Sequence, residues 1–432
     1  MKKRIPLGMT LALIMLAVAL SISLTMVFAM DRFSSTVNSV NKRQAMFDYL
    51  TEVDKAARQN YAGDIDEPAL QERLAEAYIT GIGDPYAGYL TADEYAASQR
   101  RSAGTEEGFG IGLSFLAATG EVVVSAVDEG SPAALAGVAL GDVVTSVNDT
   151  AVTPDTAGMN LALSALGEQT KVLLTVTRGG KKQAFDLTSG AYAIVSVSGQ
   201  VLHDNIGYIR ITAFNDATAE QFYTAFESLT AKKVTSFIFD LRGNTGGSVD
   251  IAAEITGYLL PRGTFAHSTA SDGTVTPLSS ASAHELTVPT VTLVDARTAG
   301  EAELLAGALR QSALTTVIGV QTAGRARVQG YFPISSDNAA VKLSVAQLSL
   351  VGSDSWEGKG ITPDEVVPLT VDALNLAMLT EETDAQLHRA VEILQAAVTP
   401  EVSDVSDTSD TSDVSDTSGT PDTSDASGES SH

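Results

Sequence analysis

Two segments of the chain have residue types at a spacing that could bind or transform a ligand. The loop Gly108-Phe109-Gly110-Ile111-Gly112-Leu113 is rich in glycine, and glycine lets backbone N–H groups approach an anion closely. We predict that Gly110, Ile111, Gly112 and Leu113 bind a carboxylate; the alternative is a glycine-rich strand entry without a ligand. The segment Thr298-Ala299-Gly300-Glu301 precedes an apolar helix, and a helix N-terminus favours developing negative charge.

The second segment lies in residues 191–398, where expected strands alternate with expected helices. This alternation predicts an α/β layer fold with a largely parallel sheet. The strands are Thr235–Leu241, Thr290–Val294 and Thr315–Val320, and the helices are Val249–Leu260, Glu301–Gln311 and Ala373–Ala397. The glycine loop belongs to a smaller β-rich unit, residues 96–190, which follows a mostly helical region at residues 31–95.

The composition excludes several kinds of chemistry. The 432 residues include 27 basic and 53 acidic side chains, which give a net charge of −26. No basic stripe is available to neutralise phosphates, so we expect no nucleic-acid partner. The absence of cysteine excludes disulfide frameworks, thiolate zinc sites, iron–sulfur clusters and thiol nucleophiles. The five histidines are too scattered to propose a metal site, and we expect no cofactor.

Residues 1–30 predict a membrane anchor. From Ile5 to Met30 the chain has no charged residue, and about 20 apolar residues are enough for a helix to cross a bilayer. A cleaved signal peptide is the alternative, although its apolar region usually has about 7–15 residues. The basic residues Lys2, Lys3 and Arg4 before the stretch predict a single-pass chain with its bulk outside the cytoplasm.

Residues 399–432 are expected to form a disordered tail. Residues 401–432 contain nine acidic residues, no basic residue and many serines and threonines. Such a segment cannot bury enough apolar surface to offset its loss of conformational entropy. We expect a plain solvated tail, with cation binding or a spacer role as the alternatives.

Several further motifs occur in a characteristic order. They are Asp84-Pro85-Tyr86, the loop Gly108–Leu113, Ile206–Ile211, Asp240–Gly247 and Gly358–Asp364. Together they resemble the C-terminal processing peptidases, also called tail-specific proteases, over residues 40–400. The resemblance implies that residues 96–190 are a PDZ domain, a module that takes up an extended peptide C-terminus as an additional strand. It also implies that residues 191–398 are the peptidase core.

The same resemblance places the catalytic positions. The family segment Thr/Ser-Ala-Ser-Ala-Ser/Ala-Glu corresponds to Thr298–Glu303, so Gly300 stands where the serine nucleophile would be. Arg325 stands at the position of the lysine base, Gln329 at that of the residue assisting the lysine, and Gly246 and Gly247 in the oxyanion loop. Glycine has no side chain to attack a carbonyl, and a guanidinium stays charged and cannot accept a proton. Glu301, in the first turn of the helix, would repel an oxyanion.

These observations predict a membrane-anchored, extracytoplasmic pseudopeptidase that binds peptide C-termini without cleaving them. One alternative is an active C-terminal processing endopeptidase that uses a non-standard nucleophile such as Thr298. Another is a structural scaffold whose groove binds no peptide. The expected partners are peptide or protein C-termini, the membrane, and either a second copy of the chain or an active relative.

Overall fold

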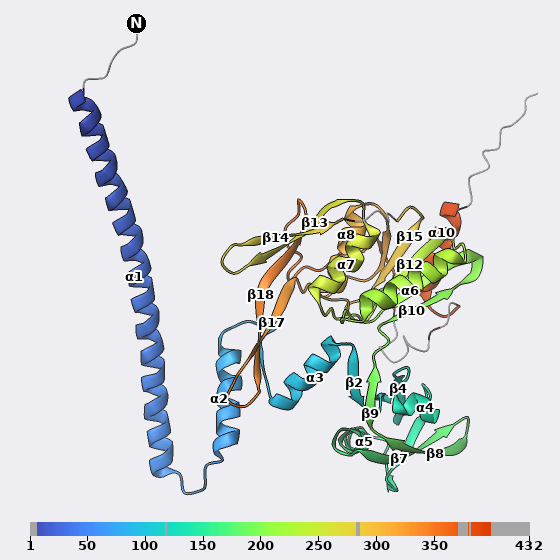
Figure 1. The fold of residues 1–432 in the computed structure, drawn as a ribbon. Helices are drawn as coiled ribbons and strands as arrows, with labels where there is room; N and C mark the ends of the chain where they lie inside the picture. Colours follow the sequence, from blue (N-terminus) through green and yellow to red (C-terminus); the bar gives the residue numbers. More distant parts are fainter. Residues whose placement is uncertain (1–6, 117–118, 282–285, 370–378, 380–381, 399–432) are drawn as a thin grey trace, which may run out of the picture. The chain divides into compact units, whose positions relative to one another are not determined.

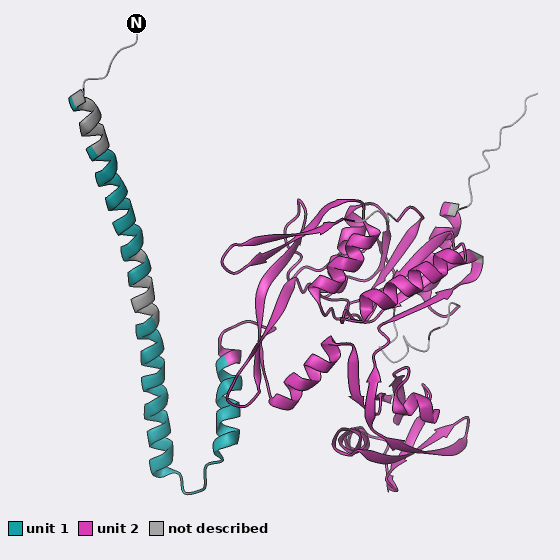
Figure 2. Cartoon of the chain, in the orientation of Figure 1, with its two compact units in different colours: residues 1–78 teal, residues 79–432 magenta. Residues whose placement is uncertain are grey.

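The computed structural model describes residues 7–116, 119–281, 286–369, 379 and 382–398. The chain divides into two compact units, residues 1–78 and residues 79–432 (Figure 2). The predicted tail, residues 399–432, lies outside the described residues.

The first unit consists of helices. Helix α1 runs from Leu7 to Asn60 as one continuous helix, and helix α2 runs from Glu67 to Gly81, with its last residues in the second unit. The Arg58 guanidinium at the end of α1 binds Asp54 at 2.7 Å and also the Glu67 carboxylate at the start of α2. The two helices are therefore tied together at their connection.

The predicted N-terminal membrane anchor is wrong. Among the residues that the structure describes, no helix is both long enough and apolar enough to cross a membrane. The predicted stretch forms the first part of helix α1, which continues without interruption through charged residues from Asp31 onward to Asn60. The single-pass, membrane-bound localisation inferred from residues 5–30 is corrected by the same finding.

The β-rich unit forms an antiparallel sheet with the strand order β3-β4-β5-β7-β8. Its hydrophobic core includes Val172, Leu174 and Val176, which alternate along one strand, as expected for a sheet with one buried face. The elements are β3 (Ile111–Leu116), β4 (Glu121–Val127), α4 (Pro132–Ala136), β5 (Val143–Val147), β6 (Thr150–Ala151), α5 (Thr156–Glu168), β7 (Lys171–Arg178) and β8 (Lys181–Thr188). Strands β2 (Thr105–Gly108) and β9 (Gly190–Ala193) pair at the entry to and exit from this unit.

The α/β core has a six-stranded sheet with the order β10-β11-β12-β15-β16-β19. The strands from β11 onward are parallel, and β10 is antiparallel to β11. All five residues of β12 and of β15 are buried, as expected for central strands covered on both faces. The elements are β10 (Val197–Val201), η1 (His203–Asn205), β11 (Ile206–Ile211), β12 (Ser236–Asp240), β15 (Thr290–Val294), β16 (Thr316–Gly319) and β19 (Glu365–Val366).

Helices cover both faces of this sheet (Figure 1). Helices α6 (Thr218–Ala231), α7 (Val249–Leu259) and α8 (Glu301–Gln311) share one hydrophobic core, whereas α10 (Ala385–Val398) packs in another with Ile238 and Leu293. The predicted α/β fold with its largely parallel sheet is thus confirmed. The helix predicted at Ala373–Ala397 begins only at Ala385 in the described part, because residues 382–384 form a turn; residues 370–378 lie outside it.

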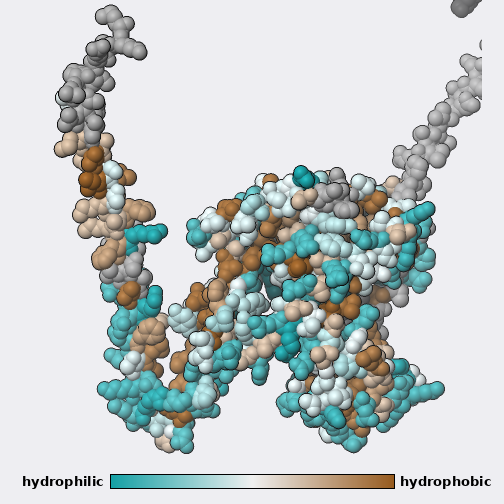
Figure 3. Space-filling model, in the orientation of Figure 1, coloured by the Kyte–Doolittle hydropathy of each residue, from teal (hydrophilic) through white to brown (hydrophobic). Residues whose placement is uncertain are grey.

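A second sheet, not predicted from the sequence, packs beside α8. Its strands are β1 (Gly88–Leu90), β13 (Gly263–Ala270), β14 (Val275–Ser280), β17 (Arg327–Pro333) and β18 (Ala340–Leu350). Helix α3 (Ala92–Ser102) follows β1, and its Tyr95 ring stacks on Tyr331 of β17. Apolar side chains gather on the surface around β17 and β18 (Figure 3), where Tyr331 and Phe332 are exposed.

Candidate functional site

Three chain segments meet at Gly300, which immediately precedes α8. A Cβ atom at this position would lie 3.6 Å from the Thr245 carbonyl oxygen, 3.7 Å from Gly246 Cα and 3.9 Å from the Arg325 carbonyl oxygen. The structure therefore brings the predicted nucleophile position, the predicted base position and the glycine loop together. Gly300 has φ +62°, a region that L-residues with a side chain rarely adopt.

The carboxylate of Glu303 holds two of these segments together. It is fully buried and accepts hydrogen bonds from the N–H groups of Gly300 (3.0 Å), Gly324 (2.7 Å) and Arg325 (2.8 Å). It also accepts a hydrogen bond from the Thr322 hydroxyl. The start of α8 and the segment 322–325 are thus fixed by a residue with no role in a serine–lysine mechanism. A glutamate three residues after a helix cap is a sequence signal for the contact with Gly300, whereas nothing in the local sequence signals its contacts with Gly324 and Arg325.

The side chain of Arg325 lies at the surface. Its guanidinium carbon is 5.9 Å from the centre of the Tyr86 ring, within the range of a cation–π interaction. Burial and then the nearby Glu357 carboxylate raise the pKa of the Tyr86 hydroxyl. In the described part of the chain, the Arg325 guanidinium has no carboxylate within 4.0 Å.

Gln329 stands at the family position of the residue that assists the lysine, but its side chain makes other contacts. Its side-chain amide donates to Ser344 Oγ at 3.2 Å and to the Arg327 carbonyl oxygen at 3.3 Å. Ser344 in turn donates from its N–H and its hydroxyl to Asp84, at 2.9 and 3.1 Å. Gln329 therefore belongs to a network that joins β17, β18 and the segment before β1.

The glycine loop after β12 is bound by acceptors of the chain itself. The Gly246 N–H donates to Asn244 Oδ1, and the Gly247 N–H donates to Glu301 Oε2, both at 2.8 Å. Glu301 is only 6% exposed, and burial raises the pKa of its carboxyl to about 7, against the hydrogen bonds from Gly247 N–H and its own N–H. The two loop positions predicted from the sequence are thus at the site, but their amides are already occupied.

Thr298 is fully buried in the turn between β15 and α8. Its hydroxyl accepts from the Asp295 N–H at 2.9 Å and lies 3.0 Å from the Leu241 carbonyl oxygen and 3.1 Å from Asp295 Oδ1. These contacts use the hydroxyl to shape the turn. A nucleophile, by contrast, needs an accessible oxygen and an adjacent base.

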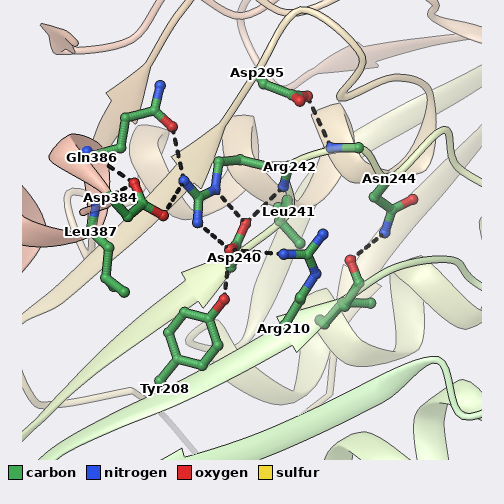
Figure 4. Close-up of polar contacts among 12 residues, drawn as sticks. Tyr208, Arg210, Asp240, Leu241, Arg242, Asn244, Asp295, Asp384, Gln386 and Leu387 are labelled. Carbon is green, nitrogen blue, oxygen red and sulfur yellow. Dashed lines mark hydrogen bonds and ion pairs between the residues drawn. The ribbon is translucent and has the colours of Figure 1, made fainter. Parts of the chain in front are cut away.

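A buried ion cluster lies under the loop and was not predicted from the sequence (Figure 4). The Arg242 guanidinium, 2% exposed, binds Asp240 at 2.6 Å and Asp384 at 2.7 Å, and Tyr208 donates to Asp240 at 2.6 Å. Burial tends to raise the pKa of the Asp240 carboxyl, but the charge and hydrogen bonds of Arg242 lower it below its ordinary value. The cluster connects β12 to the start of α10.

The predicted carboxylate-binding loop lies in the β-rich unit. Gly110 has φ +69°, and a Cβ atom there would lie 2.1 Å from Ser131 Cβ, so only glycine fits without a shift. The carbonyl oxygens of Phe109 and Gly110 accept from the N–H groups of Ala133 (3.0 Å) and Asp128 (2.9 Å). Because C=O and N–H point in opposite directions across a trans peptide, the N–H groups of Gly110 and Ile111 point away from these partners.

The strand that follows this loop lies at one end of its sheet. In the described strand order, β3 has β4 as its single neighbour. Gly112 pairs with Ala126, and Leu113 is buried in the hydrophobic core of the unit. The other edge of β3 can therefore accept an extended peptide as an additional strand.

Comparisons with known proteins find similarities for both the α/β core and the β-rich unit. Residues 205–367 match the profile of peptidase family S41, and residues 110–188 match that of the PDZ domain. The chain is 28% identical over 327 residues to the carboxy-terminal processing protease CtpA of Bacillus subtilis, covering 75% of this chain and 70% of that protein. It is 27% identical over 339 residues to a carboxyl-terminal-processing protease of Synechocystis, covering 76% of this chain and 77% of the relative.

The fold is also similar to that of a solved structure. A Bacteroides fragilis protein assigned to the S41 proteases superposes with a TM-score of 0.56 at 18% sequence identity, over 75% of this chain and 90% of that one. At this identity the likeness concerns the fold.

Proposed function

Because the chain combines a peptidase family S41 region with a PDZ domain and has carboxy-terminal processing proteases among its homologues, we propose that it binds the C-termini of peptides without cleaving them. The observation that carries this proposal is the pair Gly300 and Arg325 at one site. The first supplies no nucleophile, and the second holds its proton throughout the physiological range.

The PDZ domain supplies the binding half of the proposal. The N–H groups of Gly110 and Ile111 are directed to take the terminal carboxylate, and the free edge of β3 takes the backbone of the peptide. Ile111 and Phe115 of β3 and Met159 and Leu166 of α5 pack against the domain core. Apolar side chains at the peptide C-terminus are the ones suited to such surroundings.

An active peptidase is the competing function, because the named relatives are proteases. Thr298, two residues before Gly300, is the hydroxyl considered as a nucleophile, and its burial and turn contacts speak against nucleophilic attack. No base with an accessible lone pair contacts it in the described structure, apart from the carboxylate of Asp295 within the turn.

The test measures binding and cleavage with the same full-length chain. A peptide library with free C-termini, and the same peptides amidated at the C-terminus, are assayed for binding by fluorescence anisotropy and for cleavage by mass spectrometry. We expect saturable binding of the free-carboxylate peptides and no cleavage. Cleavage that disappears in Thr298→Ala would establish the active alternative, whereas absence of both binding and cleavage would favour a scaffold.

A further inference from the structure

Beyond the missing nucleophile and base, the core contains a third departure from a working hydrolase. In the family segment, alanine follows the serine position, and here that residue is Glu301. The Glu301 carboxylate accepts the Gly247 N–H at 2.8 Å and is also hydrogen-bonded by its own backbone N–H. A position between a loop amide and the amide that follows the nucleophile is where hydrolases of this type stabilise an acyl oxyanion.

This carboxylate is buried against the glycine loop. Glu301 is 6% exposed, and its Oε2 lies 2.3 Å from the point where a Cβ atom of Gly246 would stand. The other loop amide, that of Gly246, is bound to Asn244 Oδ1. Both amides of the glycine loop are therefore used by groups of this chain.

We infer that Glu301 is an internal occupant of the oxyanion position and by itself blocks peptide-bond hydrolysis at this site. The inference rests on the proposed function, and it predicts that restoring the nucleophile and base alone is insufficient for cleavage. It adds a specific claim, which is that the side chain at position 301 competes with the substrate carbonyl oxygen for the N–H of Gly247.

The chemistry of a restored site makes the claim testable. With Gly300→Ser and Arg325→Lys, the serine hydroxyl loses its proton to the lysine amine while its oxygen bonds to the substrate carbonyl carbon, and the carbonyl π electrons move to its oxygen. Collapse of this oxyanion breaks the C–N bond, and the leaving amine takes the proton from the lysine. Water then hydrolyses the ester by the same proton path. Two N–H donors must stabilise the oxyanion both when the ester forms and when water hydrolyses it.

The experiment compares three full-length variants. The first carries Gly300→Ser and Arg325→Lys, the second adds Glu301→Ala, and the third instead adds Glu220→Ala as a matched control. Glu220 is an exposed glutamate in the first turn of α6. Peptide cleavage and labelling by a fluorophosphonate probe are measured. Loss of one oxyanion donor costs about 10²–10³-fold in rate, so we expect cleavage and labelling at least ~100-fold faster with Glu301→Ala than with either other variant.

A second measurement does not depend on restored activity. In wild-type protein labelled with ¹⁵N-glycine, the Gly247 amide signal should shift with pH as its acceptor titrates, and this shift should vanish in Glu301→Ala. A pH-independent Gly247 signal in the wild type, or equal rates with and without Glu301→Ala, would overturn the inference. Cleavage by the wild type would instead refute the proposed function, so the two failures are distinguishable.

Discussion

Replacing Glu301 by glutamine should change how the stability of the peptidase-like core depends on pH. Burial raises the pKa of the Glu301 carboxyl from 4.5 to about 7. The nearby Glu303 carboxylate adds to this rise, and the hydrogen bonds from Gly247 and from its own N–H oppose it. Tyr331 of β17 also interacts electrostatically with Glu301. Glutamine keeps the shape and an oxygen acceptor for Gly247, but it does not titrate.

The direction of the pH effect on stability follows from which state of the chain, folded or unfolded, binds the Glu301 proton more tightly. The folded-state pKa of Glu301 is above its unfolded value, so the folded chain holds this proton more strongly. The resulting stabilisation is complete below pH 4.5 and is lost as the pH rises to about 7. A rise of this size corresponds to about 3 kcal/mol, of which about 2–3 kcal/mol falls between pH 5 and pH 8. Over that interval the wild type should lose this amount of unfolding free energy relative to Glu301→Gln.

The chain offers a probe specific to this core. Trp356 is its sole tryptophan, is 4% exposed, and lies in the hydrophobic core shared by α6, α7 and α8. Urea unfolding followed by tryptophan fluorescence at several pH values gives the free-energy difference between the two proteins. Glu220→Gln, an exposed helix-start glutamate, is the matched control. A difference between the wild type and Glu301→Gln that is the same at pH 5 and pH 8 would refute the reasoning.

Three further predictions test other parts of the structure. Arg242→Met should destabilise the core by about 3–5 kcal/mol, measured by Trp356 fluorescence, because buried Asp384 would lose its cation and buried Asp240 would keep only the longer, 3.6 Å ion pair with Arg210. Gly110→Ala should weaken the binding of free C-termini by at least tenfold in anisotropy titrations, or about 1.4 kcal/mol, because its Cβ would overlap Ser131; Gly167→Ala, with open space around it, is the control. Thr298→Ala should lower the unfolding free energy by about 1–3 kcal/mol without changing peptide cleavage, because the hydroxyl serves the turn.

The α/β core could be predicted because its strands and helices carry their own signals. The central strands β12 and β15 are rich in β-branched and aromatic residues and buried along their whole length, and each is followed by a turn and a helix. The second sheet could not be predicted, because its hairpins β13–β14 and β17–β18 are joined by pairing of β18 with β13, about 80 residues away, and with β1, about 250 residues away. The N-terminal anchor was predicted wrongly: the uncharged stretch is part of the longer helix α1, and no helix in the described part of the chain is long and apolar enough to cross a membrane.

At the site, the order of the motifs predicted that Gly300, Arg325 and the glycine loop belong to one site, and the structure places them next to one another. The role of Glu301 depends on its side chain folding back onto Gly247, which is a matter of loop geometry rather than of sequence pattern. Asp384, the ion-pair partner of Arg242, could not be predicted for another reason. The predicted helix placed it mid-helix, whereas in the structure it precedes α10 and accepts the N–H groups of Gln386 and Leu387.

The geometry of the site does not depend on the side chains at positions 300 and 325, because other groups maintain it. Glu303 binds the N–H groups at positions 300, 324 and 325 whatever side chains those positions carry. Glycine at position 300 also suits the backbone better than serine would, since φ +62° is unfavourable for a residue with a Cβ atom. A serine nucleophile there would hold strain of about 1–3 kcal/mol. Glycine rather than serine at position 300 therefore avoids this strain, whereas loss of Glu303 would leave several buried donors unpaired. Under the proposed function, a chain that binds peptides without cleaving them can therefore keep this fold with glycine at position 300.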